Sequence, residues 1–188
     1  FDLAGTISEY YYSNNPMAVE NYEATQGDKT SKVYMKNLYV SGTPQFAGTF
    51  GVRYFIDYWF LGANLNAFGR NYIDVAPARR MEGIYNTVDP TLPETMDTYY
   101  AMTTQERIGS ACTLDLSVGK IFYLRNRQSI NFNLSVNNVL NKRDIRTGGY
   151  EQARVFASDG ALVNPALFPN KYYYMQGINC FANISYRF

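Results

Sequence analysis

The side chains that could do chemistry are few in this sequence, and they form no catalytic set. The 188 residues contain no His, the side chain that most often acts as general base and metal ligand. The two cysteines, Cys112 and Cys180, lie far apart in the sequence, in no spacing typical of a metal or redox motif. We expect both to act as small apolar residues on strand faces. The chain is therefore predicted not to be an enzyme and to need no cofactor or metal.

Two pairs of residues have the chemistry of ligand contacts. Arg79-Arg80 could bind an acidic group through paired N–H donors, and Tyr99-Tyr100 could stack on a sugar. The alternative is that they are solvated loop residues or contacts to a partner protein. A nucleic-acid partner is not expected, because 17 basic and 16 acidic residues leave a net charge of only +1, and nucleic-acid binding normally requires a strongly basic face.

Six segments alternate apolar and polar residues, as β-strands with two unlike faces do. The clearest is 172–188, which is longer than the roughly 5–6 residues usual in soluble strands. The others are 130–140, 112–122, 59–70, 46–56 and, more weakly because Glu9 falls on its apolar face, 1–12. Lys120 interrupts one apolar face near a strand end, where its long stem can reach a membrane interface. The 18 Tyr and 12 Phe suit both strands and such an interface.

The connections between these segments alternate strictly in length. Short turns are predicted at 57–58 and 124–129, and long loops at 13–45, 73–108 and 141–171. Loops beyond about 12–15 residues are uncommon in compact soluble domains. Short turns alternating with long loops are typical of an outer-membrane barrel. The segment 33–42 is interpreted as a strand extension within the first long loop.

The two faces have different solvent requirements. Strands survive in a bilayer only as part of a closed barrel, with the apolar face on lipid and the polar face on the lumen. A soluble β-sandwich or β-barrel, for example a glycan-binding module, would instead bury the apolar face. Asn residues on the polar face and aromatic residues at both ends of 172–188 favour lipid. Six strands are fewer than the roughly eight of the smallest barrels, so we expect part of a larger one.

Several short motifs resemble a known family in their order and spacing. They are Gly42-Thr43-Pro44-Gln45, Gly51-Val52-Arg53-Tyr54, Trp59-Phe60, Tyr72-Ile73-Asp74, Pro77-Ala78-Arg79-Arg80, Leu134-Ser135-Val136-Asn137-Asn138-Val139-Leu140-Asn141-Lys142, Ile145-Arg146-Thr147-Gly148-Gly149-Tyr150-Glu151-Gln152, Phe168-Pro169-Asn170-Lys171-Tyr172-Tyr173-Tyr174 and Tyr186-Arg187-Phe188. The chain resembles the C-terminal region of Bacteroidetes TonB-dependent receptors of the SusC-like group. The resemblance implies an all-β chain that supplies about six antiparallel transmembrane strands to a barrel of about 22.

The resemblance also implies a function and partners. Residues 1–188 would be the C-terminal part of an outer-membrane nutrient-uptake receptor for a large nutrient such as an oligosaccharide or peptide. The rest of the barrel, the plug domain and the segment that contacts the TonB complex would lie outside this chain. A SusD-like surface lipoprotein and the lipid bilayer would be further partners. An outer-membrane enzyme is a weaker option, because His is missing.

The last strand carries a further expectation from the same resemblance. Ile184, Tyr186 and Phe188 match the alternating apolar end that serves these receptors as an outer-membrane assembly signal. The alternative is that the three side chains simply face lipid.

Overall fold

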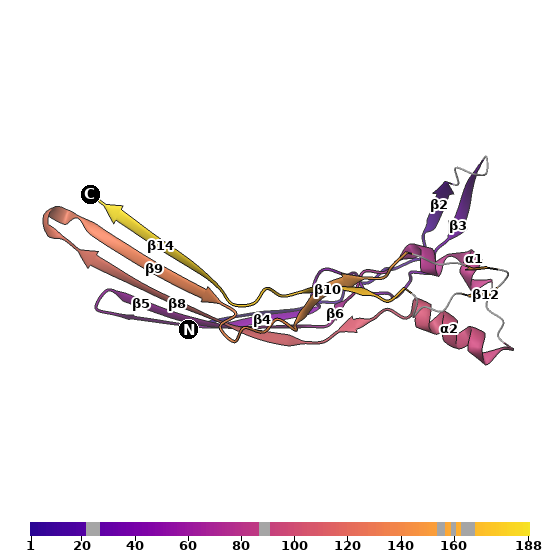
Figure 1. Ribbon diagram of the computed structural model, residues 1–188, viewed down its shortest axis with the longest axis horizontal. Coiled ribbons are helices and arrows are strands. Elements are labelled where there is room, and N and C mark those ends of the chain that lie inside the picture. Colours follow the sequence, from indigo (N-terminus) through magenta and orange to yellow (C-terminus); the bar gives the residue numbers. More distant parts are fainter. Residues whose placement is uncertain (22–26, 87–90, 154–156, 159–160, 163–167) are drawn as a thin grey trace.

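The computed structural model describes residues 1–21, 27–86, 91–153, 157–158, 161–162 and 168–188. The fold is mostly antiparallel β-sheet, with 52% strand and 13% helix. The molecule is elongated, with the large sheet toward one end and a hairpin and helices at the other (Figure 1). The sequence-based prediction of a mostly antiparallel β-sheet chain is confirmed, but the chain is not entirely β, because its long connections also contain helices.

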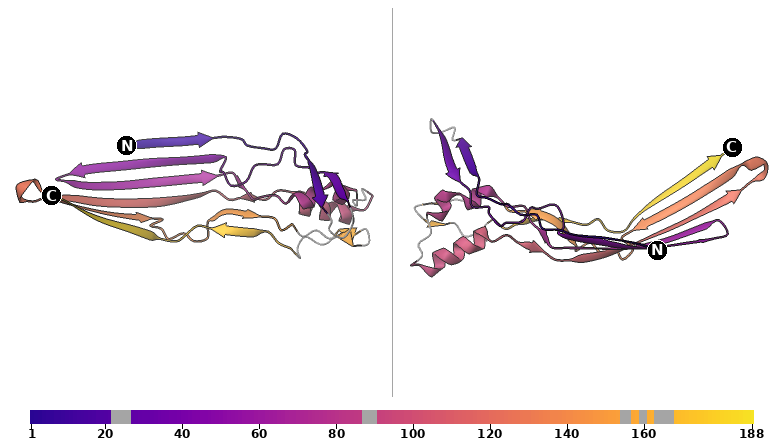
Figure 2. Two further views of the ribbon diagram at one scale, coloured as in Figure 1. Left: turned by 90° about the horizontal axis from the view of Figure 1, so that it is seen from above. Right: turned by 180° about the vertical axis from the view of Figure 1, so that it is seen from behind.

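The large sheet contains the six predicted strands. In spatial order they are β1 Asp2–Ile7, β4 Phe46–Ile56, β5 Trp59–Gly69, β8 Ala111–Tyr123, β9 Ser129–Asn137 and β14 Asn179–Arg187. Neighbours in this order are also neighbours among the six along the chain, and every pair is antiparallel. Figure 2 shows the strands lying side by side in one layer. The sheet is therefore a simple meander.

The two predicted short turns are confirmed. Asp57 and Tyr58 alone join β4 to β5, with φ of 46° and 65°. Two successive residues of positive φ are typical of a type I′ hairpin, whose twist matches that of the flanking strands. The second turn, between β8 and β9, contains the short 3-10 helix η2 Arg125–Arg127.

The long connections contain elements of their own. They are β2 Met17–Asn21, β3 Asp28–Lys32, β6 Asn71–Tyr72, the 3-10 helix η1 Pro77–Arg80, α1 Glu82–Tyr85, α2 Pro93–Thr103, β7 Arg107–Ile108, β10 Arg146–Tyr150, β11 Ala157–Ser158, β12 Ala161–Leu162 and β13 Lys171–Tyr174. We call the described parts of residues 8–45, 70–110 and 138–178 the loop head. Sequence analysis missed α2, although Pro93 followed by Glu94 is a common way for a helix to begin.

The prediction of one continuous strand over 172–188 is wrong. Residues 171–174 form β13, which pairs with β10 in a small two-stranded sheet. The chain then has no strand partner until Asn179, where β14 begins to pair with β9 in the six-stranded sheet. Side chains from the end of β9 hold the chain between: Asn138 Nδ2 donates to the Gln176 carbonyl at 2.9 Å. Asn141 Oδ1 accepts from the Ile178 N–H at 3.0 Å. These bonds replace ladder bonds without disturbing the alternation of residue types.

The prediction of a strand extension at 33–42 is also wrong in its position. The first long connection does project a hairpin, but it is formed by β2 and β3 and ends at Lys32. After it, Asn15 Oδ1 accepts from the N–H groups of Met35 and Lys36 at 3.0 and 2.8 Å. Asn37 then turns the chain with φ of 69°. The apolar residues of this segment are needed in a core rather than in a strand.

The conventional hydrophobic core of the described residues lies in the loop head. Its buried apolar members are Val33, Met35, Ile73, Val75, Ala76, Met102, Ile108 and Ile145. None of them belongs to the six-stranded sheet. The loop head therefore has a buried apolar interior of its own, whereas the six-stranded sheet contributes no residue to that core.

Candidate functional surfaces

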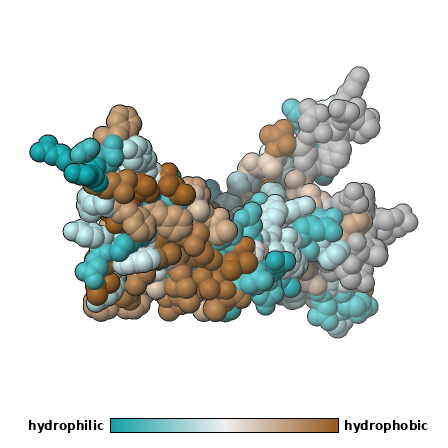
Figure 3. Space-filling model, turned by 60° about the vertical axis from the view of Figure 1, so that its left-hand side comes forward, coloured by the Kyte–Doolittle hydropathy of each residue, from teal (hydrophilic) through white to brown (hydrophobic). Residues whose placement is uncertain are grey.

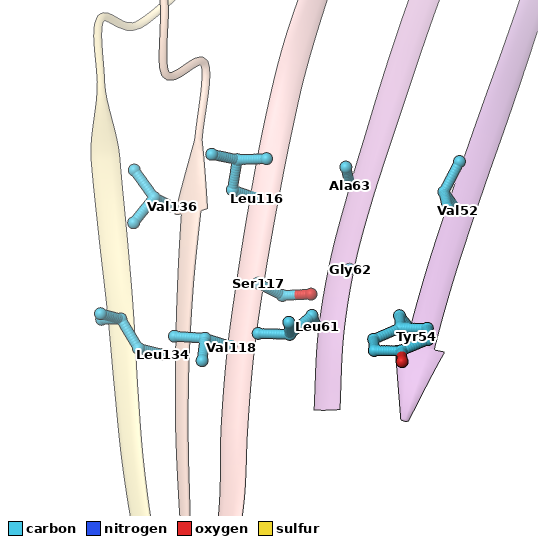
Figure 4. Close-up of a pocket in the computed structure, with 10 residues that line it drawn as sticks. All are labelled: Val52, Tyr54, Leu61, Gly62, Ala63, Leu116, Ser117, Val118, Leu134 and Val136. Carbon is cyan, nitrogen blue, oxygen red and sulfur yellow. The ribbon is translucent and has the colours of Figure 1, made fainter. Parts of the chain in front are cut away.

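The register of the sheet places on one side the predicted apolar residues that lie within the six paired strands. Cross-strand partners run, for example, from Tyr54 to Leu61, Val118, Leu134 and Ala182. Figure 4 shows residues of this row and the next one lying across neighbouring strands. Since a slip of one residue would reverse a strand's faces, this agreement over six strands means that the pattern specified the register.

The apolar face is open to its surroundings. Leu61, Leu65 and Leu116 are 44%, 46% and 41% exposed, although they lie on interior strands of the sheet. The opposite face is partly covered, from Thr113, which is 6% exposed, to Ser117 and Asn64, which are exposed. Figure 3 shows hydrophobic residues gathered in a broad band with hydrophilic residues to either side. Contiguous apolar surface of this kind marks contact with a partner or a membrane.

The polar face is linked across strands by hydrogen bonds. Thr49 Oγ1 donates to Asn66 Oδ1 at 2.9 Å, and Asn66 Nδ2 donates to Asp115 Oδ2 at 2.7 Å. The other oxygen of Asp115 accepts from the Asn138 N–H at 2.8 Å. Asn137 and Asn179 form a further side-chain pair at 3.0 Å. Each hydrogen bond gives a partner to polar groups that would otherwise need water as their partner.

Glycines make room for these polar side chains. A Cβ on Gly51 would lie 2.7 Å from Asn64 Oδ1, and one on Gly119 would lie 2.5 Å from Asn133 Oδ1. Gly62 is equally close to Ser117 Oγ. On the apolar face, Gly48 has only ordinary contacts, the nearest at 3.6 Å. The polar face is therefore the more crowded one, as expected on the inner side of a curved sheet.

Lys120 lies near the end of its strand, as expected, and its side chain reaches the first short turn. The residue lies on the apolar face of β8, opposite Trp59 and Phe132. Its stem turns toward the short turn, where Nζ donates to the Asp57 carbonyl at 2.6 Å. Nζ also lies 4.8 Å from the centroid of the Trp59 ring, within cation–π range.

The expected assembly residues share one edge of the sheet. Ile184 and Tyr186 lie on the apolar face of β14, opposite Phe132 and Ile130. They are 71% and 53% exposed, and Phe188, just beyond the strand, is 94% exposed. Three exposed apolar side chains at a sheet edge are accessible, so they could contact either lipid or the outer-membrane assembly machinery. Their role as an assembly signal remains a prediction.

The two arginines proposed as ligand contacts are buried. Arg80 is 2% exposed and forms a two-pronged ion pair with Glu151, at 2.5 and 2.7 Å. It also donates to the Thr103 carbonyl, while Glu151 accepts from the Ala76 N–H. Arg79 donates to two backbone carbonyls, and burial lowers its pKa. In this arrangement both guanidinium groups join segments of the head, and neither is presented to a ligand.

The tyrosine pair lies on α2. The rings of Tyr99 and Tyr100 meet edge to face at 5.8 Å, with Tyr100 55% exposed and Tyr99 half-buried. Tyr100 therefore offers a ring to a ligand or partner, at the opposite end of the molecule from the sheet (Figure 1). The structure does not bring the tyrosines and the arginines into one site.

A polar cluster around Glu106 was not predicted. Tyr172 Oη and Asn170 Nδ2 donate to Glu106 Oε2 at 2.7 and 2.9 Å, and Arg146 pairs with Oε1 at 3.1 Å. Arg146 also lies 4.0 Å from the centroid of the Tyr172 ring. The bond to Glu106 raises the pKa of Tyr172. The members come from segments far apart in the chain, so no local pattern could indicate the cluster.

Other classes of site are missing from the part of the chain that the structure describes. No group of three His, Cys, Asp or Glu residues could hold a metal ion. Cys112 and Cys180 are free thiols. Among the same residues, no helix is both long enough and apolar enough to cross a bilayer.

Comparisons with models of known protein families, with curated proteins and with solved structures find no match for this chain.

Proposed function

We propose that this chain is the C-terminal wall of an outer-membrane transport barrel. The observation that carries the proposal is the open apolar face that runs across all six strands of the sheet, opposite a face whose polar side chains are linked by hydrogen bonds. Lipid is the solvent that suits such an exposed face. A water-filled or plugged lumen suits the Asn, Ser and Thr side chains opposite.

In this proposal the chain is one part of a closed cylinder. Within the described residues, β1 and β14 each have one edge with no strand partner. Unpaired edges are not stable in hydrocarbon, so further strands of the same receptor must cover them. We propose a barrel of about 22 strands, in which β14 is the closing strand and runs from the cell surface to the periplasm.

We further propose that the receptor imports a large nutrient, such as an oligosaccharide or peptide, with energy supplied through TonB. The support for nutrient import is the order and spacing of the short motifs that resemble TonB-dependent receptors. The plug would lie inside the barrel, and the loop head would meet nutrient and a SusD-like lipoprotein at the cell surface. Deleting the gene should abolish growth on one such nutrient, with rescue dependent on TonB.

The membrane assignment can be tested with a matched pair of neighbouring residues. In the full receptor, Cys112 and Cys180 are replaced by Ala, and a nitroxide spin label is placed at position 134 or 133. The label at Leu134 should be relaxed by oxygen, which concentrates in lipid, and the label at Asn133 by a water-soluble nickel complex. A soluble glycan-binding module would bury Leu134 from both reagents and expose Asn133 on its outer surface. Recovery of the receptor in the aqueous fraction without detergent would also defeat the proposal.

A further inference from the structure

The apolar face of the sheet carries one charged side chain among its described residues, Lys120. Its ammonium has three donors, and the bond to the Asp57 carbonyl uses one of them. The rings of Trp59 and Phe122 lie 4.8 and 5.9 Å from Nζ and hold the cation at the end of the sheet where the short turns are. Two donors remain for an anion approaching along the apolar face.

The second short turn adds positive charge at the same end of the sheet as Lys120. Arg125 and Arg127 are exposed there. The Tyr58 and Tyr123 rings contact each other at 5.0 Å, which places the two turns next to each other. The turn end of this wall is therefore cationic, with Asp57 as the one acidic side chain of the two turns.

A hollow in the apolar face begins one row beyond Lys120. It has a volume of about 520 Å³ and is lined by side chains of four strands, among them Val52, Leu61, Ala63, Leu116, Val118 and Leu134. Val118 precedes Lys120 on the same face of β8. The hollow exists because Ala63 is short where its neighbours in the row, Val52 and Leu116, are branched (Figure 4).

We propose that the hollow and Lys120 form a binding site for one anionic phospholipid. The phosphate oxygens accept from Lys120 Nζ, with Arg125 and Arg127 adding positive charge at the same end of the sheet, and an acyl chain lies over Ala63 between Val52 and Leu116. The inference rests on the proposed function, since it places the short turns at the periplasmic leaflet, where phospholipid is the available lipid. A fixed cation beside an apolar depression distinguishes this site from the rest of the lipid-facing surface.

Native mass spectrometry of the full receptor can test the site. The receptor is released from nanodiscs containing phosphatidylglycerol and phosphatidylethanolamine, and the retained lipids are counted. Lys120→Gln, which keeps the stem and removes the charge, should lower retained phosphatidylglycerol about fivefold, as expected for one basic residue at a membrane surface. Ala63→Leu, which fills the hollow and leaves Lys120 in place, should lower it as well. The matched control is Lys171→Gln, an exposed lysine of the loop head, which should have no effect.

The site would be disproved if Lys120→Gln retained as much phosphatidylglycerol as the wild type. Equal losses of both lipids would also disprove it, because the charge would then select no headgroup. An equal loss of phosphatidylglycerol in Lys171→Gln would disprove it too, because the loss would then follow the net charge of the receptor and not the position of Lys120. These outcomes differ from failure of the proposed function, in which the wild-type receptor would not enter the nanodisc at all.

Discussion

The loop head and the six-stranded sheet place apolar side chains differently. In the head, Ile73 and Val33 are 0% and 1% exposed and lie in the interior. In the sheet, Leu65 at a central strand position is 46% exposed, and polar side chains of the other face, such as Asn64 and Ser117, are exposed as well. A chain that builds one conventional interior can bury apolar groups where water is the solvent. The open apolar face of the sheet therefore points to a second solvent or a partner on that side.

The two regions also treat charge differently. The head buries the Arg80–Glu151 pair, with both side chains nearly inaccessible. The sheet keeps its one described ion pair, Arg53–Asp2, exposed on the polar face. A buried pair is sensitive to the loss of either partner, whereas an exposed pair is screened by water. Substitutions in the two regions should thus have separable consequences.

The largest effect is expected from Arg80→Met. Removing the guanidinium leaves Glu151 charged and buried, which should destabilise the head by about 3–5 kcal/mol. Limited proteolysis of the full receptor should show faster cleavage in residues 70–110, with the barrel still resistant. Arg53→Met is the matched control and should leave proteolysis of the head unchanged. Equal protection of the two variants would show that the pair does not hold the head together.

The next largest effect is expected from Leu134→Arg. On a lipid-facing strand an arginine near the middle of the bilayer costs about 2–4 kcal/mol. The folded fraction in urea titrations of the receptor in lipid vesicles should fall accordingly. Asn133→Arg, on the polar face, should cost much less, because the proposed barrel places that face on its lumen. Similar costs at both positions would remove the distinction between the two faces.

A moderate effect is expected from Gly119→Ala. The new Cβ would lie 2.5 Å from Asn133 Oδ1 and 3.1 Å from the Phe132 carbonyl oxygen, so the strands must shift at a cost of about 1–3 kcal/mol. Gly48→Ala, on the open apolar face, is the matched control and should be nearly neutral in the same titration. A larger cost for Gly48→Ala would mean that the apolar face is the crowded one.

The smallest effect concerns the pH dependence of the head. The bond to Glu106 raises the pKa of Tyr172 above its ordinary value of 10.0. The folded head therefore holds the Tyr172 proton more tightly than the unfolded chain does. Its contribution to stability is complete below pH 10 and is lost as the pH rises through the raised pKa.

The measurement is the rate of proteolysis of the head between pH 9 and pH 12. Tyr172→Phe should remove part of the rise in rate above pH 10, while the sheet stays resistant. An identical pH profile in the wild type and Tyr172→Phe would contradict the assignment.

Much of the sheet was predictable because alternation is local information. Each strand's residue types determine which side chains share a face, and the length of the turn at Asp57-Tyr58 determines how β4 and β5 pair. Position 120 illustrates the same point, since a lysine near the end of an apolar strand face can turn toward the polar groups of the neighbouring turn. The break at Met175 was not predictable, because the alternation continues through it while bonds from Asn138 and Asn141 hold the chain outside the sheet.

The candidate ligand residues show the opposite case. Arg79-Arg80 has the chemistry of an anion site, and composition offers no way to know that Glu151 would meet Arg80 in the interior. The Glu106 cluster likewise joins residues from segments distant in the chain. Contacts of this kind depend on how the long connections fold over one another.

By itself, then, the sequence determined the six strands, their two faces, their short turns and the order of short and long connections. These follow from period-2 alternation and turn chemistry, which act over a few residues. Only the tertiary structure decided that the long connections form a head with its own core, that the arginine pair is buried there, and that the apolar face contains a hollow beside Lys120. Those features depend on contacts between segments that are distant in the sequence, and such contacts leave no local pattern in the chain.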